Sequence, residues 1–227
     1  MAEGPTVVLV HGAWHGGWCW EKVLPLLADA GVTAAAIDLP LTSLHDDVAA
    51  TRDAIDEVGG PVVLCGHSYG GAVITEAGHH PAVEHLVYIT AFACDEGESP
   101  AATATDADVP GTDLGGALVI DGDSVTLTRD GAINGLYHDC DPADIEAALA
   151  RLRPIDISCI TTPVGPPAWK DTASTYAVCA NDAGVHPDLQ RVMAARCTHS
   201  VEWPTAHSPF LNRPDLVADL LIGLARL

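Results

Sequence analysis

Basic residues are scarce in this sequence. Its 227 residues include 10 Lys and Arg against 31 Asp and Glu, which gives a formal net charge of −21 at pH 7, and Lys22 and Lys170 are its only lysines. Because such a surface repels polyanions, nucleic acid and anionic membranes are excluded as partners. We expect the excess of acidic residues to serve solubility alone.

Long apolar segments and paired cysteines are also missing. No apolar run reaches the about 20 residues that span a membrane, and the first residues lead straight into a strand-like segment without the pattern of a secretion signal. Seven cysteines are scattered without a C-x-x-C pair, and several lie in apolar segments, as buried reduced thiols do. The sequence therefore predicts a soluble, cytoplasmic protein without a metal or cofactor.

Apolar segments alternate with helical patterns along most of the chain. Hydrophobic residues make up 48% of the sequence. Between the apolar segments, hydrophobic residues spaced three and four apart predict amphipathic helices. Continuous apolar segments are typical of strands buried on both faces of a parallel sheet, and they predict six strands, at residues 6–10, 32–37, 62–64, 83–89, 175–180 and 200–203. This order predicts a doubly wound, six-stranded, mostly parallel sheet of the α/β class.

The alternation stops between residues 95 and 172. This segment is rich in Ala, Thr, Asp, Gly and Pro, and its clearest helix pattern covers residues 142–152, after Asp141. A stretch of this length is too long for a loop in a compact domain. We expect an inserted cap at 95–172 between two parts of one α/β core, at 1–94 and 173–227. As an alternative, the 142–152 helix is the crossover to the next strand.

The motif G-x-S-x-G occupies residues 66–70, after the apolar run 62–64 and before a helix of small residues. Glycines are needed two positions either side of the serine because a strand-to-helix turn this tight leaves little room for side chains. The turn lifts the Ser68 hydroxyl off the sheet and places the Tyr69 backbone N–H at a helix N-terminus, where it can bind an oxyanion. An ordinary glycine-rich turn is the competing interpretation, but the flanking strand and helix favour a nucleophile.

A nucleophilic serine needs a base, and the base works best when a carboxylate orients it. Functional groups gather beyond the carboxyl ends of parallel strands, so His207, in the loop after the last strand, is the candidate base, whereas His199 lies at the opposite end of that strand. Asp182 directly follows the penultimate strand, and the order Ser68, Asp182, His207 is typical of this fold. Asp188 competes, but its place at the start of a helix suits dipole stabilisation.

The loop after the first strand offers a second oxyanion donor. The backbone N–H of Ala13 is the candidate, because the preceding Gly12 permits close approach. We interpret His11 and His15 as hydrogen-bonding residues that pack this loop, since no carboxylate or cysteine lies at the spacing of a metal site. His67 is likewise interpreted as a structural residue beside the nucleophile.

Together these features resemble the α/β-hydrolase superfamily over essentially the whole chain. More narrowly, residues 10–20, Val-His-Gly-Ala-Trp-His-Gly-Gly-Trp-Cys-Trp, and the Asp-Leu-Pro turn at 38–40 are similar to one branch. That branch holds plant methyl-salicylate and methyl-jasmonate esterases, hydroxynitrile lyases and bacterial relatives. The resemblance implies a cap over the pocket, with Ser68 as nucleophile, His207 as base, Asp182 as its orienting carboxylate, and Ala13 and Tyr69 as the oxyanion hole.

The sequence departs from that branch at residues 41–43. Relatives usually carry a Gly-His-Gly stretch there, which is shortened to Leu-Thr-Ser in this chain, and we expect a reshaped pocket wall. In the hydroxynitrile lyases of the branch, a lysine follows the catalytic histidine and a threonine replaces Gly12. Here Ser208 follows His207. The resemblance therefore favours the esterases over the lyases.

We expect a serine carboxylesterase that cleaves a small, partly apolar ester without a cofactor. Trp14, Tyr137 and Trp169 are candidate linings of an apolar pocket, although each is equally compatible with a place in the core. A lyase or other non-hydrolytic tailoring enzyme on the same scaffold, and a hydrolase-like ligand receptor with slow turnover, stay open. Nothing in the sequence defines the oligomeric state.

Overall fold

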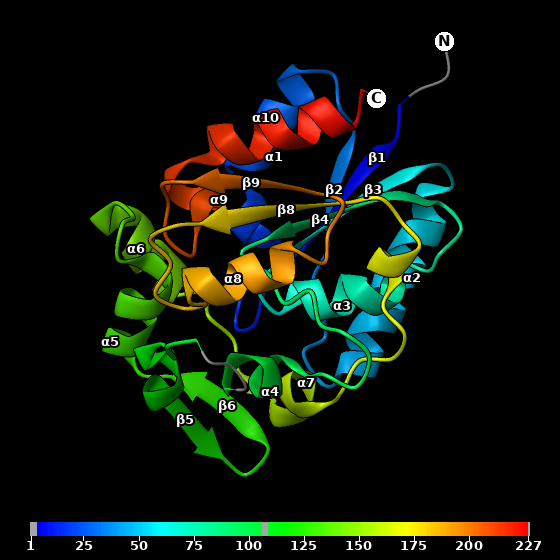
Figure 1. Cartoon of the computed structure of the whole chain (residues 1–227). Coiled ribbons are helices and arrows are strands. Elements are labelled where there is room, and N and C mark those ends of the chain that lie inside the picture. The colour runs from blue at the N-terminus through cyan, green and yellow to red at the C-terminus, as the bar shows by residue number, and fades with distance from the viewer. Residues whose placement is uncertain (1–3, 106–108, 227) are drawn as a thin grey trace.

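The computed structural model describes residues 4–105 and 109–226, and its centre is a six-stranded sheet (Figure 1). The spatial order of the strands is β2-β1-β3-β4-β8-β9, and each neighbouring pair is parallel. Their bounds are β1 Thr6–Val10, β2 Ala34–Ala36, β3 Val62–His67, β4 Val83–Ile89, β8 Ser174–Cys179 and β9 His199–Trp203. β3 is buried along its whole length and β1 along most of it, as expected for a sheet covered on both faces.

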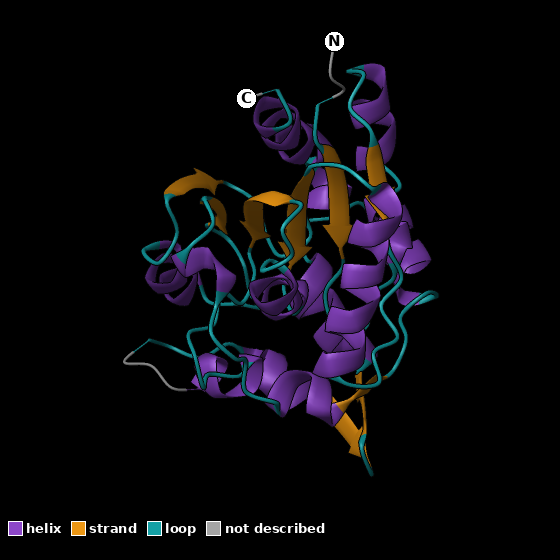
Figure 2. Ribbon diagram, turned by 90° about the vertical axis from the view of Figure 1, so that its right-hand side faces the viewer, coloured by secondary structure: helices purple, strands orange, loops and turns teal. Residues whose placement is uncertain are grey.

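Helices cover both faces of this sheet (Figures 1 and 2). α1 and α10 contact each other on one face, and α2 and α3 contact each other on the opposite face, where α8 packs against β8. The main helices are α1 Val23–Asp29, α2 Leu44–Val58, α3 Gly70–Ala77, α8 Pro187–Ala194, α9 Pro209–Asn212 and α10 Pro214–Leu224. The predicted doubly wound α/β architecture is confirmed.

Local signals define the ends of α2. Ser43 occupies the N-cap position, where its Oγ accepts a hydrogen bond from Asp46 N at 3.0 Å. The helix ends at Gly59, whose φ of 66° lies in the left-handed region that glycine reaches at low cost. These two residues determine where α2 begins and ends.

The chain between β4 and β8 forms an insertion with its own small sheet. β5 and β6 form an antiparallel hairpin, and β7 pairs with β6. The 142–152 helix pattern corresponds to α6, which ends at Leu149 and lies between β6 and β7 in the chain. The elements are α4 Pro100–Thr105, η2 Asp113–Ala117, β5 Leu118–Asp121, β6 Ser124–Leu127, α5 Arg129–Ala132, η3 Ile133–Tyr137, α6 Pro142–Leu149, β7 Ile155–Asp156, α7 Ile157–Thr161 and η4 Ala168–Lys170.

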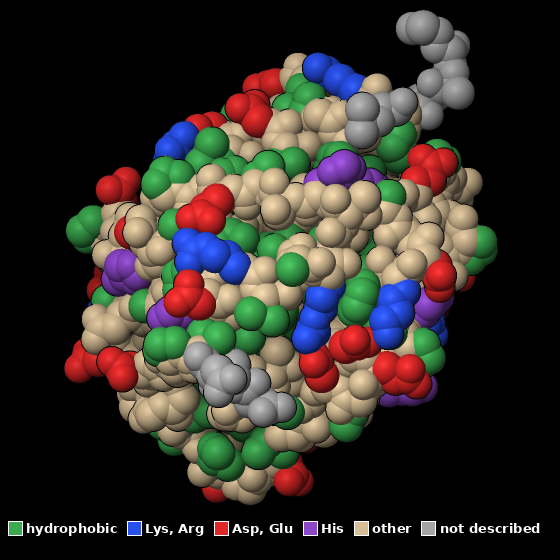
Figure 3. All heavy atoms as spheres, in the orientation of Figure 1, with side chains coloured by type: hydrophobic (Ala, Val, Ile, Leu, Met, Phe, Trp, Pro, Cys, Tyr) green, Lys and Arg blue, Asp and Glu red, His purple; other side chains and the backbone are tan. Residues whose placement is uncertain are grey.

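The surface in Figure 3 shows basic side chains next to acidic ones. Both lysines are paired in this way: Lys22 Nζ lies 2.6 Å from an oxygen of Asp144, and Lys170 Nζ lies 2.6 Å from an oxygen of Asp95. Among the residues that the structure describes, no helix has both the length and the apolar character needed to cross a membrane.

Candidate active site

Ser68 lies at the turn between β3 and α3. Its φ is 51°, a left-handed value that is strained for a residue other than glycine. The neighbouring glycines permit this turn because a Cβ at Gly66 would lie 2.6 Å from Gly70 O, and one at Gly70 would lie 2.6 Å from His11 O. The side chain of Ser68 is buried except for a small part that faces a cavity.

His207 and Asp182 form a buried hydrogen-bonded pair. The distance from His207 Nδ1 to Asp182 Oδ2 is 2.8 Å, and both side chains are at most 2% exposed. Asp182 follows β8 and His207 follows β9, so the carboxyl ends of adjacent strands bring them together. Asp188, the competing carboxylate, is exposed and pairs with Arg191 at 2.6 Å.

The carboxylate of Asp182 has four further donors. Gly184 N and Val185 N donate to Oδ1 at 2.6 and 3.0 Å. Gln190 Nε2 donates to Oδ2 at 3.0 Å, and Thr90 Oγ1 also donates to Oδ2. Since each partner is a donor, the site is built for an acceptor-only group.

Sequence reasoning missed Thr90 and Gln190. Thr90 follows β4 with a φ of 41°, and Gln190 is a fully buried polar residue on α8. The one usable signal was the position of Thr90 directly after a predicted strand. Gln190 carried no signal, because a glutamine inside a helix is usually solvent-exposed.

Two residues that line the cavity beside Ser68 have free backbone donors. Ala13 and Tyr69 both line this cavity, and within the described residues neither backbone N–H donates to a protein acceptor. Ser68 Oγ has no hydrogen-bond partner among the described residues, and His207 bonds Asp182 through Nδ1. Catalytic hydrogen bonds often form only when the substrate is bound. Two unpaired N–H groups next to a hydroxyl are suited to bind an oxyanion.

The loop after β1 is braced by two histidines. His11 Nδ1 donates to Gly12 O at 2.8 Å, and its Nε2 accepts from Leu39 N at 2.9 Å. His15 Nδ1 donates to Ala13 O at 2.7 Å. Burial lowers the pKa of His11 to about 4 and that of His15 to about 3, so both are neutral near pH 7. They act as the packing residues that the sequence suggested.

His67 connects the turn at Ser68 with the loop that carries His207. Its Nε2 donates to His207 O at 2.8 Å, and the two rings meet edge to face with centroids 4.8 Å apart. Burial holds the pKa of His67 well below its usual range, so the ring is neutral. A Cβ at Gly12 would lie 2.8 Å from Ser68 Cβ and 2.9 Å from His67 Nδ1. Glycine at position 12 is therefore required for this close packing.

The cavity at Ser68 has a volume of about 180 Å³, and none of the described residues that line it carries a charged side chain. Core residues and residues of the insertion both contribute to its walls. The lining residues are Ala13, Trp14, Ser68, Tyr69, Phe92, Pro100, Ala101, Ala104, Thr105, Thr112, Leu114, Gly115, Leu118, Ile160, Gly184 and Val185. Such a cavity is suited to a small, mainly apolar ligand.

The three candidate pocket aromatics have different places. Trp14 lines the cavity, and its Nε1 donates to Val125 O at 3.1 Å. Tyr137 is fully buried behind the loop, where its hydroxyl donates to His15 Nε2 at 2.7 Å. Trp169 Nε1 donates to Cys94 O, and the ring packs against the core. Of the three, Trp14 alone is among the described residues that line the cavity at Ser68, and a place of Tyr137 or Trp169 in the substrate pocket stays a prediction.

A parallel sheet of this order, with a strained serine after its third strand and a histidine–aspartate pair after its last two, defines an α/β hydrolase. The chain belongs to the alpha/beta hydrolase family, whose model matches residues 7–220. One relative, the alpha/beta hydrolase nvfD of Aspergillus novofumigatus, is 30% identical over 97% of this chain and 96% of that protein.

Two further similarities are to proteins that are named as an esterase and a hydrolase. Methylesterase 2 of Arabidopsis thaliana is 28% identical over 96% of this chain and 95% of that protein. The crystal structure of a pyrethroid hydrolase from Sphingobium faniae superposes with a TM-score of 0.86 at 23% identity, over 98% of this chain and 97% of that chain. The likeness to the solved structure shows the shared fold.

Proposed function

We propose that the protein is a serine hydrolase that cleaves a small, partly apolar carboxylic ester through an acyl-enzyme on Ser68. The observation that carries this proposal is the buried His207–Asp182 pair, whose histidine packs against Gly184 in the wall of a cavity that Ser68, Ala13 and Tyr69 also line. The family and the esterase relatives support the same reaction class.

In the proposed reaction, Ser68 Oγ attacks the ester carbonyl and transfers its proton to His207 Nε2. The N–H groups of Ala13 and Tyr69 stabilise the oxyanion, and Asp182 stabilises the charge that forms on His207. The tetrahedral intermediate collapses when the alcohol leaves with the proton from His207. Water then attacks the acyl-enzyme, His207 accepts its proton, and the acid leaves as Ser68 regains a proton.

The insertion at 95–172 is proposed to act as the cap of this pocket. It contributes Leu114, Leu118 and Ile160 to the cavity wall, so its side chains decide which esters fit. The substrate is a small molecule, and the net charge of −21 argues against nucleic acid and membrane partners. We place the reaction in the cytoplasm, without a metal or cofactor.

A lyase is the nearest rival on this scaffold. A leaving cyanide needs a fixed cation in a water-poor pocket, because an uncompensated anion there costs several kcal/mol. Within 4–105 and 109–226, no residue with a charged side chain lines the cavity. Ser208 follows His207, and Lys22 and Lys170 pair with surface carboxylates. These observations favour hydrolysis.

We expect the protein to hydrolyse p-nitrophenyl acetate with multiple turnovers and to release no cyanide from mandelonitrile above the buffer rate. Hydrolysis is monitored through the absorbance of the released nitrophenolate, and cyanide is measured colorimetrically in parallel. Cyanide release that depends on Ser68, without esterase activity, would replace this proposal by a lyase. A single slow turnover of every ester tested would replace it by a ligand receptor.

Trp14 is expected to limit the length of the acyl chain. It lines the cavity at Ser68 and also a second cavity of about 390 Å³, which has Leu127, Leu149 and Leu152 in its wall. Trp14→Ala removes the indole between the two cavities and should join them. A longer acyl chain could then extend into the second cavity, where each methylene that becomes buried contributes about 0.8 kcal/mol. We expect the ratio of kcat/KM for p-nitrophenyl octanoate to that for the acetate to rise by about tenfold.

The matched control is Trp169→Ala, which removes an indole that lies outside the cavity. Its chain-length profile should equal that of the unmodified enzyme. An unchanged profile in Trp14→Ala, or an equal shift in both variants, would show that Trp14 does not bound the acyl site.

A further inference from the structure

Asp47 is a buried carboxylate that takes no part in the reaction described above. It lies in the first turns of α2, its side chain is fully buried, and burial raises its pKa. It does not line the cavity at Ser68 and is not hydrogen bonded to His207 or Asp182. A buried carboxylate is costly unless its oxygens are satisfied, so its partners show what it holds in place.

Three segments converge on the Asp47 carboxylate. The Tyr69 hydroxyl donates to Oδ2 at 2.6 Å, Leu41 N donates to Oδ1 at 2.7 Å, and the Cys159 thiol donates to Oδ2 at 3.7 Å. Tyr69 belongs to the turn at the nucleophile, Leu41 to the loop after β2, and Cys159 to α7 of the insertion. Leu41 has a φ of 60°, so its loop is held in a strained conformation at this contact.

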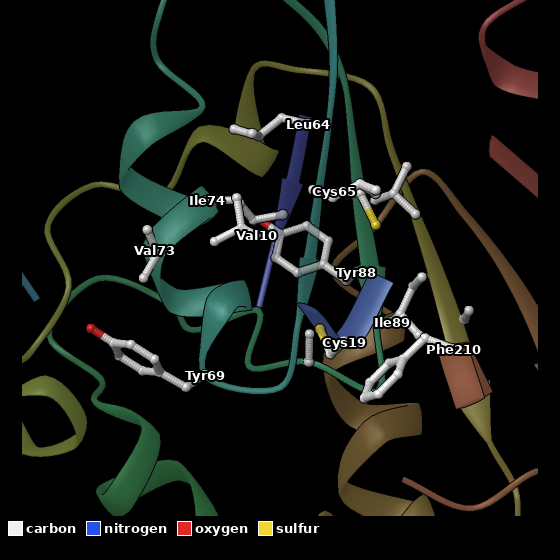
Figure 4. Close-up of a cluster of buried hydrophobic side chains, with 14 of the residues drawn as sticks. Val10, Cys19, Leu64, Cys65, Tyr69, Val73, Ile74, Tyr88, Ile89 and Phe210 are labelled. Carbon is white, nitrogen blue, oxygen red and sulfur yellow. The ribbon is translucent and has the colours of Figure 1, made fainter. Parts of the chain in front are cut away.

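The contact with Tyr69 is the one that reaches the reaction. The backbone N–H of Tyr69 is the proposed oxyanion donor. Its ring is part of the buried cluster in Figure 4, where the hydroxyl end points away from Val10 and Tyr88 and toward the hydrogen bond with Asp47. The phenol is 1% exposed and ends on the Asp47 carboxylate. Fixing both ends of one residue, the start of α3 and the phenol oxygen, restricts rotation of the peptide between Ser68 and Tyr69.

We propose that Asp47 is a positioning residue that orients the Tyr69 backbone N–H toward the oxyanion through its hydrogen bond with the Tyr69 phenol. The inference rests on the proposed function, since it needs Tyr69 N–H to be an oxyanion donor. It goes beyond that function because it extends the catalytic machinery to α2 on the far side of the nucleophile turn. Through Cys159, the same carboxylate also links the turn to the insertion.

The test compares Asp47→Leu, Asp47→Asn and Tyr69→Phe in the full-length enzyme. Deleting one oxyanion donor outright lowers kcat by about 10²–10³-fold, and a donor that is present but misaligned should cost less. We expect kcat for p-nitrophenyl acetate to fall by about tenfold in Tyr69→Phe and at least as much in Asp47→Leu, with KM changed less than threefold. Asp47→Asn keeps an acceptor oxygen and should recover part of the loss.

A second measurement reports on the oxyanion itself. Ser68 adds to the carbonyl of a trifluoromethyl ketone, and the adduct presents a tetrahedral oxyanion to the same N–H groups. The Ki of this inhibitor should therefore rise in parallel with the fall in kcat. A double-mutant cycle with Asp47→Leu and Tyr69→Phe should be non-additive, because both changes remove the same contact. Rates are expressed per active site, from titration with a fluorophosphonate.

The control for a general loss of stability is Ile55→Ala, which changes a fully buried residue eight positions after Asp47 in α2. It should lower the melting temperature and leave kcat per active site and Ki unchanged. Folded Tyr69→Phe with wild-type kcat and Ki would overturn the inference, as would additive effects in the double-mutant cycle. If the unmodified enzyme shows no ester turnover that depends on Ser68, the proposed function is overturned instead.

Discussion

Replacing Ser68 by alanine is expected to abolish ester turnover and leave the fold intact. In a triad enzyme, loss of the nucleophile lowers kcat by about 10⁶-fold, and the residual rate comes from the oxyanion hole and binding. The effect on stability should be small, because within the described residues the hydroxyl makes no hydrogen bond and faces the cavity. Turnover of p-nitrophenyl acetate and the thermal melting temperature measure the two effects separately.

A fluorophosphonate probe tests the same assignment covalently. The unmodified enzyme should be labelled at Ser68, as located by peptide mass spectrometry, and Ser68→Ala should not be labelled. Ser99→Ala is the matched control, since Ser99 is a buried serine whose hydroxyl caps a short helix of the insertion. Labelling that persists in Ser68→Ala would assign the nucleophile to another residue.

The core and the turn at Ser68 were predictable because their signals are local in the sequence. A parallel strand buried on both faces is a continuous apolar run, and β1 was predicted with the bounds that the structure has. The turn at Ser68 needs two glycines at fixed spacing, which makes it readable from five residues. His207 and Asp182 were predictable because the carboxyl ends of parallel strands lie at one edge of a sheet.

Residues that act on the site through distant contacts were not predictable. Thr90 bonds Asp182 across 92 positions of the chain, and Asp47 bonds Tyr69 across 22. Such pairs depend on how α2 and the strands pack, which no local pattern encodes. The contact of Tyr137 with His15 was not predictable either, because it joins residues 122 positions apart in the chain.

Replacing Asp182 by asparagine is expected to lower kcat by about 10⁴-fold, by analogy with the triad template in which this change fixes the wrong histidine tautomer. The structure gives the reason. An amide nitrogen at the Oδ2 position would face His207 Nδ1, so the ring must carry its proton on Nε2 and cannot accept one from Ser68. An amide nitrogen at the Oδ1 position would face two backbone donors, Gly184 N and Val185 N.

Either orientation opposes a donor to a donor in a buried site, so we also expect Asp182→Asn to lower the melting temperature. The kcat is therefore normalised to the folded fraction measured by circular dichroism. Asp188→Asn is the matched control: it removes an exposed ion pair with Arg191 that contributes at most about 1 kcal/mol, and kcat should stay within twofold. If Asp188→Asn showed the large loss of kcat and Asp182→Asn did not, the orienting role would belong to Asp188, and the buried pair of Asp182 with His207 would be structural.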